Sequence, residues 1–509
     1  MNFQIQPAKL KTWYQKGFVV PLVHRIQLKT DPWQVAKSLL VDTTNGFFLD
    51  SVRFQDKTAR YSYLGWKPFR IFRTHDTRQV IPGLKRLLES YQGRKWPELP
   101  FFTGGAVGYL SYELAHAFEQ LPDQAEDDLD LDRAAFLLVR DLLVFDHKDG
   151  TYFLVANLIP KEDGPFEKAL QKAINALEGM KTQIGTVSEN RDSSHVSASV
   201  DFAIRGFQAD LSKRGFKEMV LRAKEYIEAG DIYQANLSQR FSFEFKGRLE
   251  TLYESLRTIN PSPFSSLLKV GPLAVASVSP ERLIKLDGRV CQTRPIAGTR
   301  PRGKTDAQEQ KLRRDLIMSP KERAEHIMLV DLERNDLSRV SEPKSVCVNE
   351  LMTLERYSHV VHIVSNISGR LKKECDRWDL LRAVFPGGTI TGCPKIRSME
   401  IIEELEPFKR HLYTGSIGYL DFNGDMDFNI IIRSLIFYKG NGYLQVGAGI
   451  VYDSIPEAEY WETLHKGKAL IDALCGCTSR SSLREGRKAD EAIPRSEIAS
   501  ASLENDASQ

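Results

Sequence analysis

The 509-residue sequence predicts an α+β fold, and three observations carry that prediction. Runs rich in aromatic and β-branched residues, typical of strands, are interspersed with runs of helical periodicity throughout the chain. These runs do not repeat as regular β-α-β units, which favours mixed or antiparallel sheets with helices packed outside them. With 42% hydrophobic and 10% aromatic residues, the chain can bury a substantial core, which argues against a largely disordered protein.

The strand-like runs come first in the chain, at 60–73 and 151–159. Apolar residues at helical spacing then predict a helix from Phe216 to Ile227, which Gly230 ends as a C′ glycine. Further strands are predicted over 239–245, 272–278, 359–368 and 429–438, and further helices over 319–340 and 457–474.

Two stretches interrupt this globular texture. Residues 181–200 are polar and Ser-rich, which is typical of a linker. Residues 478–509 contain no aromatic side chain and little apolar periodicity, which predicts a disordered tail. The chain is therefore expected to divide into an N-terminal region over 1–180 and a C-terminal region over 201–477, in keeping with its length.

Charge and cysteine content limit the classes of function. Lys and Arg number 70 against 67 Asp and Glu, so a formal charge of +3 gives no electrostatic case for binding nucleic acid. The six cysteines form no CxxC pair and are typical of thiols in a reducing compartment. The N-terminus lacks the apolar segment of a signal peptide, and the most apolar stretch, 270–278, is far shorter than the roughly 20 residues of a membrane helix. We therefore expect a cytoplasmic protein with no nucleic-acid or membrane partner.

Two of the predicted helices carry pairs of carboxylates on one face. Glu322 and Glu325 lie at i and i+3, and Glu459, Glu462 and Lys466 lie at i, i+3 and i+7. Taken alone, each stripe is typical of a solvated surface. If the fold brings the two stripes together, they form an oxygen-ligand site suited to Mg²⁺. Zinc is not expected, because the histidines and cysteines show no ligand spacing.

A glycine-rich loop precedes a predicted helix near residue 395. Gly387 and Gly392 are followed by Cys393 and Pro394 rather than by Lys-Ser/Thr, so this is not a Walker A loop. Pro394 suits the first turn of the helix. The loop is either an anion cradle or a tight turn.

Three basic side chains lie in apolar, strand-like runs. Strand periodicity places His359 and His362 on opposite faces, so one of them can point into a site. Arg433 lies in the predicted strand at 429–438, where a buried guanidinium requires either a protein carboxylate or a ligand carboxylate.

Together these segments resemble one family, the chorismate-utilising enzymes, and specifically the large aminating subunits of anthranilate synthase and aminodeoxychorismate synthase. The similar segments run in family order from about residue 60 to 470, and several are long and specific. They include GDIYQANLSQRF, SVSPERLI, QTRPIAGTRPRG, ERAEHIMLVDLERNDLSRV, YSHVVHIVSNISG, FPGGTITGCPKIRSMEIIEEL, YTGSIGYLDFNGDMDFNIIIRSL and GAGIVYDSIPEAEYWETLHKGKA.

The resemblance implies a two-lobed fold with the active site between the lobes, Mg²⁺ as cofactor and chorismate as substrate. It also implies a role for each matching residue. The resemblance assigns the magnesium carboxylates to Glu325, Glu459 and Glu462, with Glu322 close by. It assigns the binding of the substrate carboxylates to Lys466, Arg433 and Tyr413, with the backbone at Gly447 and the hydroxyl of Thr299. It makes Glu281 the general acid that protonates the departing 4-hydroxyl, and His362 the active-site histidine.

Position 234 indicates which nucleophile is used. Family members that add water to chorismate carry a lysine base there, whereas this chain has Gln234, which cannot deprotonate water. Ammonia needs no such base. The chain shows no glutaminase signature, so the resemblance implies a separate glutamine amidotransferase subunit as the ammonia source.

The choice between the two aminating activities depends on three places in the sequence. Phe264 and Ser265 depart from the segment that helps form a tryptophan feedback pocket in anthranilate synthases, and residues 47–52 resemble another part of that pocket in changed form. Ala297 stands where many aminodeoxychorismate synthases have a lysine that adds to the ring, and it leaves the anthranilate route open. We favour aminodeoxychorismate synthase component I, of p-aminobenzoate and folate biosynthesis, over anthranilate synthase component I, of tryptophan biosynthesis.

Overall fold

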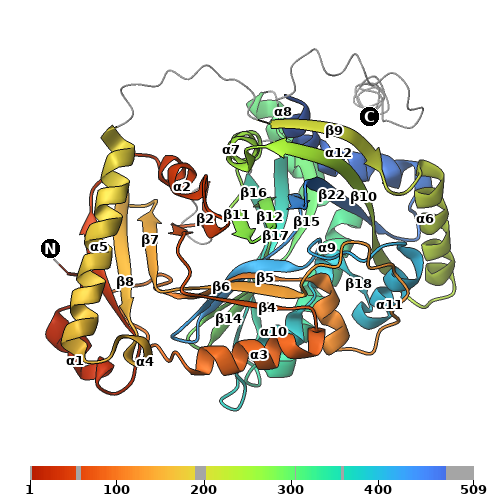
Figure 1. Ribbon diagram of the computed structural model, residues 1–509. Helices are drawn as coiled ribbons and strands as arrows, with labels where there is room; N and C mark the ends of the chain where they lie inside the picture. Colours follow the sequence, from red (N-terminus) through yellow and green to blue (C-terminus); the bar gives the residue numbers. More distant parts are fainter. Residues whose placement is uncertain (1–2, 53–58, 190–201, 304, 357–359, 477–509) are drawn as a thin grey trace.

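Two antiparallel sheets that pack against each other form the centre of the protein (Figure 1). The computed structural model describes residues 3–476 apart from 53–58, 190–201, 304 and 357–359. The predicted α+β class, with antiparallel sheets and outer helices, is confirmed.

The first sheet has 12 strands, which come from both the N-terminal and the C-terminal parts of the chain. In spatial order its strands are β1 (Val20–Ile26), β8 (Thr151–Leu158), β7 (Asp141–Asp146), β3 (Tyr61–Gly65), β2 (Asn45–Asp50), β11 (Phe264–Val270), β12 (Leu273–Ser279), β21 (Ser434–Tyr438), β22 (Asn441–Ile450), β10 (Gln234–Gly247) and β18 (Gly392–Cys393), with β9 (Phe202–Ala209) paired to β10.

The second sheet has 10 strands and also mixes early and late segments. Its order is β15 (Ile296–Pro301), β17 (Val360–Arg370), β14 (Val290–Arg294), β13 (Arg282–Asp287), β20 (Met426–Ile430), β19 (Ser416–Asp421), β5 (Gly105–Leu110), β6 (Ala134–Val139) and β4 (Arg70–Thr74), with β16 (Cys347–Arg356) paired to β17.

Strand periodicity explains how the second sheet separates two cores. Along β5, Val107 and Tyr109 are buried in the core shared with the first sheet. Their neighbours Ala106 and Leu110 point the other way, into a second core formed with helices. Buried side chains on both faces therefore make this a layered molecule of sheet, sheet and helices.

Helices cover the outer faces of the layers. In Figure 1, α5 lies along β8, and α12 packs on β22. The helices are α1 (Pro7–Tyr14), α2 (Pro32–Leu40), α3 (Thr77–Glu89), α4 (Pro160–Asp163), α5 (Phe166–Glu189), α6 (Lys213–Glu228), α7 (Leu249–Ile259), α8 (Asp306–Met318), α9 (Pro320–Val340), α10 (Arg377–Val384), α11 (Lys395–Leu405) and α12 (Pro456–Gly476), with short 3₁₀ turns η1 (Tyr112–Ala117) and η3 (Gly388–Ile390).

The predicted linker is wrong over 181–189, because α5 continues to Glu189. The apolar stripe of Leu177, Met180 and Ile184 stays buried there and outweighs the polar composition. The rest of the predicted linker and the predicted tail lie outside the described residues. In both sheets the strands from before residue 180 form one side and those from after residue 201 form the other, and the two sides pair through β2 and β11 in the first sheet and β5 and β19 in the second.

The prediction of one strand over 429–438 is also wrong. The chain leaves the second sheet at the end of β20 and enters the first sheet at β21, and Arg433 lies between them with a φ of +51°. A non-glycine residue in this left-handed conformation turns the chain and ends regular pairing. Arg433 therefore lies where the chain passes from one sheet to the other.

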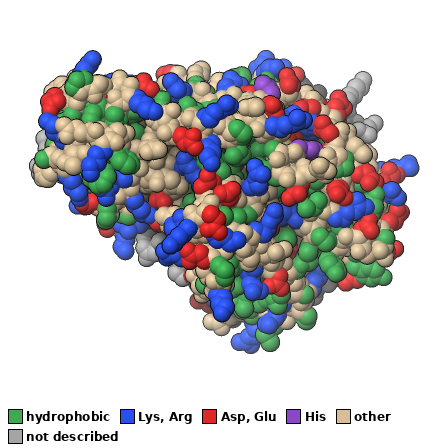
Figure 2. Space-filling view, turned by 90° about the horizontal axis from the view of Figure 1, so that it is seen from below, with side chains coloured by type: hydrophobic (Ala, Val, Ile, Leu, Met, Phe, Trp, Pro, Cys, Tyr) green, Lys and Arg blue, Asp and Glu red, His purple; other side chains and the backbone are tan. Residues whose placement is uncertain are grey.

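The surface agrees with the near-neutral composition. Figure 2 shows basic and acidic side chains intermingled over the face seen from below. No helix among the described residues is long and apolar enough to cross a membrane.

Candidate active site

Two crossings between the sheets bring Glu281 next to the Arg433 segment. The chain passes from β12 in the first sheet to β13 in the second through Glu281, just as it passes back through Arg433. The crossings are hydrogen-bonded to each other: the N–H of Ile430 donates to the carbonyl of Glu281 at 3.1 Å, and that of Val278 to the carbonyl of Arg433 at 3.1 Å. Residues about 150 positions apart thus meet between the sheets.

The Glu281 carboxyl group is buried, with 4% of the residue exposed. Burial raises the pKa of Glu281 to about 7, while the Thr389 side chain, the N–H of Ile296 and the charge of Arg433 oppose the shift. The Ile296 N–H lies 3.4 Å from Oε1. A carboxyl group with such a pKa holds a proton near neutral pH and can donate it.

Strands β15 and β17 carry three further predicted residues, and Ile296 at the start of β15 contacts Glu281. His362 pairs with Thr299 across these strands, and Ala297, which is 8% exposed, lies two residues earlier on β15. Burial, with the charge of Arg433, lowers the pKa of His362 to about 3, so its imidazole is neutral at physiological pH. The Thr299 side chain and His359 lie outside the described residues.

Helices α9 and α12 bring the two predicted carboxylate stripes together. Glu325 on α9 is electrostatically coupled to Glu462 and Lys466 on α12. Burial and the negative charges of Glu322 and Glu462 raise the pKa of Glu325, and burial with Glu462 raises that of Glu459. Glu462 itself is exposed, and Lys466 outweighs burial and lowers its pKa. The acids of the two helices are therefore electrostatically coupled, with Glu459 the most buried of them.

This donor set fits a hard divalent cation. Oε2 of Glu459 is buried and has no hydrogen-bond partner among the described residues, while Oε1 accepts from Ser454 at 2.7 Å. Mutual repulsion of neighbouring carboxylates is relieved when a cation lies between them. Glu322 fits less well, because its Oε1 already accepts from Arg300 at 3.0 Å.

Two of the groups predicted to hold substrate carboxylates, Lys466 and Tyr413, lie at Gly447 of β22. Lys466 Nζ lies 2.8 Å from Glu462 Oε1 and donates to the carbonyl of Gly447 at 3.1 Å. A Cβ atom at Gly447 would lie 2.7 Å from Asn236 Oδ1 and 2.7 Å from Tyr413 Oη. Because Gly447 has no side chain, Asn236 and Tyr413 can lie close to the backbone of β22.

Gly447→Ala is expected to raise the KM for the substrate by about tenfold or more, because contacts below 3.0 Å force Asn236 or Tyr413 to move and small displacements in a site are costly. Steady-state kinetics measure the effect. The control is Gly179→Ala on α5, where a Cβ meets nothing within 4 Å and the KM is expected to stay unchanged. An unchanged KM in Gly447→Ala would remove Gly447 from the binding site.

Gln234 is the first residue of strand β10, and its side chain lies near the carboxylate of Glu325. Its Nε2 lies 3.5 Å from Glu325 Oε1, and its Oε1 is buried without a hydrogen-bond partner in the described part of the chain. The amide side chain has no basic atom that could take a proton from water.

Two residues of the site, Asn236 and Thr389, were not predicted from the sequence. Asn236 lies two residues after Gln234 on β10 and donates from Nδ2 to the carbonyl of Thr389 at 3.3 Å. Thr389 belongs to the glycine-rich loop, whose carbonyl of Thr391 accepts from the N–H of Asn236 at 2.8 Å. The loop thus packs against β10 as a structural part of the site. Both residues lie within segments that resemble the family, which was the one feature of the sequence that pointed to them.

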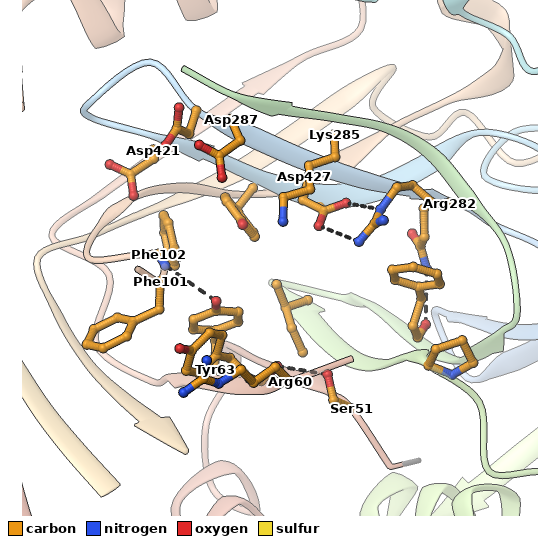
Figure 3. Close-up of a pocket in the computed structure, with 18 of the residues that line it drawn as sticks. Ser51, Arg60, Tyr63, Phe101, Phe102, Arg282, Lys285, Asp287, Asp421 and Asp427 are labelled. Carbon is orange, nitrogen blue, oxygen red and sulfur yellow. Dashed lines mark hydrogen bonds and ion pairs between the residues drawn. The ribbon is translucent and has the colours of Figure 1, made fainter. Parts of the chain in front are cut away.

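A separate cavity of about 270 Å³ lies between the sheets (Figure 3). The two segments associated by resemblance with a tryptophan pocket meet there, since Asp50 and Ser51 line it together with Phe264 and Ser265. The Arg282 guanidinium on its wall pairs with Asp427 at 2.9 Å. None of the predicted substrate or metal residues lines this cavity.

Comparison with known proteins agrees with this geometry. Residues 50–472 match the family described as chorismate binding enzyme. The chain is 40% identical to anthranilate synthase component 1 of Acetivibrio thermocellus, over 84% of this chain and 90% of that protein. It is 42% identical to aminodeoxychorismate synthase component 1 of Bacillus subtilis, over 79% of this chain and 83% of that protein.

A solved structure has the same fold. Anthranilate synthase component I from Streptococcus pneumoniae superposes with a TM-score of 0.70 at 33% identity, over 82% of this chain and 93% of that chain. The menaquinone-specific isochorismate synthase MenF from Escherichia coli shares the fold, with a TM-score of 0.68 at 19% identity. The resemblance seen in the sequence is confirmed, and the protein belongs to the chorismate-binding enzyme family, as a chorismate-utilising enzyme of the anthranilate and aminodeoxychorismate synthase class.

Proposed function

We propose that the protein aminates chorismate in a Mg²⁺-dependent reaction, with ammonia supplied by a separate glutamine amidotransferase, to give 4-amino-4-deoxychorismate. The observation that carries amination is Gln234 beside Glu325, because an amide cannot activate water as a nucleophile while ammonia needs no base. Ammonia forms the new C–N bond and loses a proton, and the departing hydroxide takes a proton and leaves as water.

Each residue has a defined part in this proposal. Glu281 holds a proton near neutral pH and gives it to the departing ring oxygen. Lys466 and Arg433 pair with the two substrate carboxylates, and Tyr413 donates a hydrogen bond to one of them. Neutral His362 lies near Arg433 without adding a charge.

Glu325, Glu459 and Glu462 would hold the magnesium ion. When bound there, Mg²⁺ supplies positive charge that neutralises the ring carboxylate and withdraws electrons from the ring. The crowded acids and the unpaired Oε2 of Glu459 support this assignment.

One observation favours a second product. Ala297 offers only a methyl group at the position where a lysine would add to the ring, so ammonia can add directly at the 2-position. Loss of pyruvate then gives anthranilate. An isochorismate-forming activity is disfavoured by Gln234.

A product assay separates these outcomes. Purified protein is mixed with chorismate, Mg²⁺ and an ammonium salt, and products are resolved by mass and fluorescence. We expect a non-fluorescent product that keeps its enolpyruvyl group and becomes p-aminobenzoate only when a separate lyase is added. Fluorescent anthranilate with released pyruvate would establish the second candidate, and isochorismate formed without ammonia would contradict amination.

A further inference from the structure

A buried ion pair lies directly behind the candidate site. Arg410 and Glu406, which are 2% and 4% exposed, form two parallel hydrogen bonds: Nε to Oε2 at 2.8 Å and Nη2 to Oε1 at 2.7 Å. None of the roles assigned so far uses this pair. A buried ion pair contributes little net stability compared with apolar packing, so what the two partners hold in place is the informative feature.

The remaining donors of Arg410 bind two backbone segments of the site. Nη1 donates to the carbonyl of Ile390 at 2.9 Å, and Nη2 donates to the carbonyl of Asn236 at 2.5 Å. Ile390 follows Thr389, which faces Glu281, and Asn236 is the residue whose Oδ1 faces Gly447. A planar guanidinium has its donors in a fixed fork, so it sets the distance between these segments.

Glu406 extends the connection along β10 and into β22. Its Oε1 accepts from both the N–H and the hydroxyl of Ser238, each at 2.8 Å. Gln445 on β22 donates to the same hydroxyl at 2.8 Å. Two residues beyond Gln445 lies Gly447, so the pair reaches the strand that Lys466 contacts.

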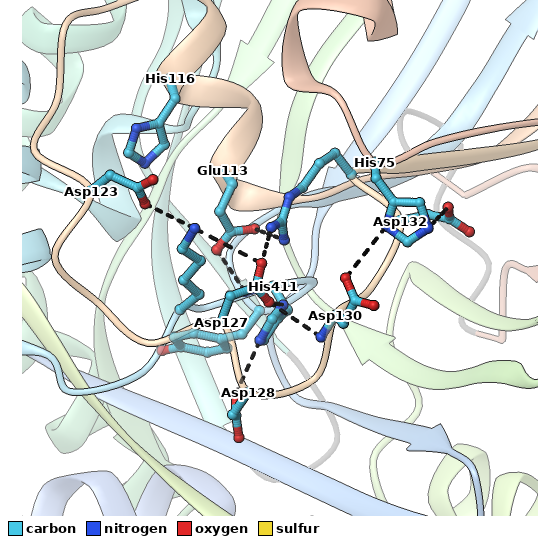
Figure 4. Close-up of polar contacts among 12 residues, drawn as sticks. His75, Glu113, His116, Asp123, Asp127, Asp128, Asp130, Asp132 and His411 are labelled. Atoms are coloured by element: carbon cyan, nitrogen blue, oxygen red, sulfur yellow. Dashed lines mark hydrogen bonds and ion pairs between the residues drawn. The ribbon is translucent and has the colours of Figure 1, made fainter.

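The segment that carries Arg410 is itself fixed from the opposite side by an acidic loop (Figure 4). Lys409 pairs with Asp123 at 2.8 Å, and His411 Nε2 lies 3.3 Å from Asp128. Tyr413 follows on this segment, with its ring centroid 5.7 Å from the Arg410 guanidinium. Arg410 therefore lies where the glycine-rich loop, β10 and the segment of Tyr413 meet.

We propose that Arg410 and Glu406 are positioning residues that hold the glycine-rich loop, the start of β10 and Tyr413 in the arrangement that binds chorismate. The effect on turnover rests on the proposed function, whereas the effect on backbone order does not. The pair does not touch the substrate; it acts through Asn236, Ile390 and Tyr413.

The chain offers a matched control. Arg140 is 8% exposed, forms two hydrogen bonds to Asp163 at 3.0 and 2.8 Å, and donates to the carbonyl of Asn157 at 2.8 Å. It lies away from the candidate site. Arg410→Gln and Arg140→Gln therefore remove the same kind of buried pair at two places, and Arg410→Lys keeps the charge without the fork.

The experiment measures the KM and kcat for chorismate with ammonia, together with hydrogen exchange of the backbone amides over 234–238 and 386–394. We expect Arg410→Gln to lower kcat/KM by about 10- to 100-fold, mainly through KM, and to speed exchange in both segments. Arg410→Lys is expected to be intermediate. Arg140→Gln is expected to keep the wild-type KM and exchange in both segments.

The outcomes are distinguishable. Equal KM and equal exchange in Arg410→Gln and Arg140→Gln would overturn the proposal. If Arg410→Gln fails to fold, Arg410→Lys decides, and wild-type KM and exchange in that variant would overturn the proposal as well. If the wild-type protein does not consume chorismate, the proposed function fails, and the exchange comparison still decides whether the pair positions these segments.

Discussion

Replacement of Glu325 by Gln is expected to abolish Mg²⁺-dependent consumption of chorismate. Glu325 is the acid at which the stripes of α9 and α12 meet, and its pKa is raised by burial and by the charges of Glu322 and Glu462. The amide keeps the shape of the side chain and removes the charge that would bind the cation. A metal supplies several kcal/mol of charge stabilisation, and about 3 kcal/mol corresponds to about a 100-fold loss of turnover.

Two measurements test this expectation. Turnover is measured as a function of Mg²⁺ concentration, and the melting temperature is measured with and without Mg²⁺, since an ion that binds only the folded state raises it. The control is Glu250→Gln on α7, a buried helical glutamate, which pairs with Lys269 outside the site. Full turnover in Glu325→Gln, or an unchanged Mg²⁺ dependence of its melting temperature, would contradict the assignment of Glu325 as a metal ligand.

The turnover number is expected to fall as the pH rises above about 7, because only protonated Glu281 can donate to the departing oxygen. Burial raises this pKa from 4.5 to about 7, so the active, protonated form predominates below pH 7 and is lost above it. Glu281→Gln removes the proton and is expected to lower kcat by about 10²- to 10⁴-fold. The profile is recorded at constant free ammonia, since ammonium itself loses a proton on the alkaline side.

A second variant tests the sign of this shift. The Thr389 side chain favours the charged form of Glu281, so Thr389→Val is expected to raise the pKa and move the alkaline limb of the profile to higher pH. A profile in Thr389→Val that moves to lower pH, or a Glu281→Gln variant that keeps the wild-type profile, would contradict the assignment of Glu281 as the acid.

The sequence by itself determined the features that depend on local geometry. Spacing of i and i+3 places Glu322 with Glu325, and Glu459 with Glu462, on one face of a helix wherever that helix packs, and both helices are present as α9 and α12. Apolar periodicity likewise predicted the helix that ends before Gly230. The ordered, specific segments determined the family.

Local composition failed where long-range packing decided. The Ser-rich stretch after Lys181 was predicted to be a linker, but α5 runs to Glu189 and Ile184 continues its buried face. The run at 429–438 was predicted as one strand, but its two halves pair in different sheets on either side of Arg433. Both errors arise because the gain from burial depends on neighbours distant in sequence.

Only the tertiary structure decided the chemistry of the candidate site. The pKa of Glu281 is raised because two sheet crossings about 150 residues apart enclose it. The two carboxylate stripes are coupled although α9 packs on β15 and β17 of the second sheet and α12 packs on β22 of the first. Gly447 faces Asn236 and Tyr413 only through the pairing of β22 with β10. Burial and charge proximity are properties of the folded arrangement, whereas residue type and helical spacing are already present in the chain.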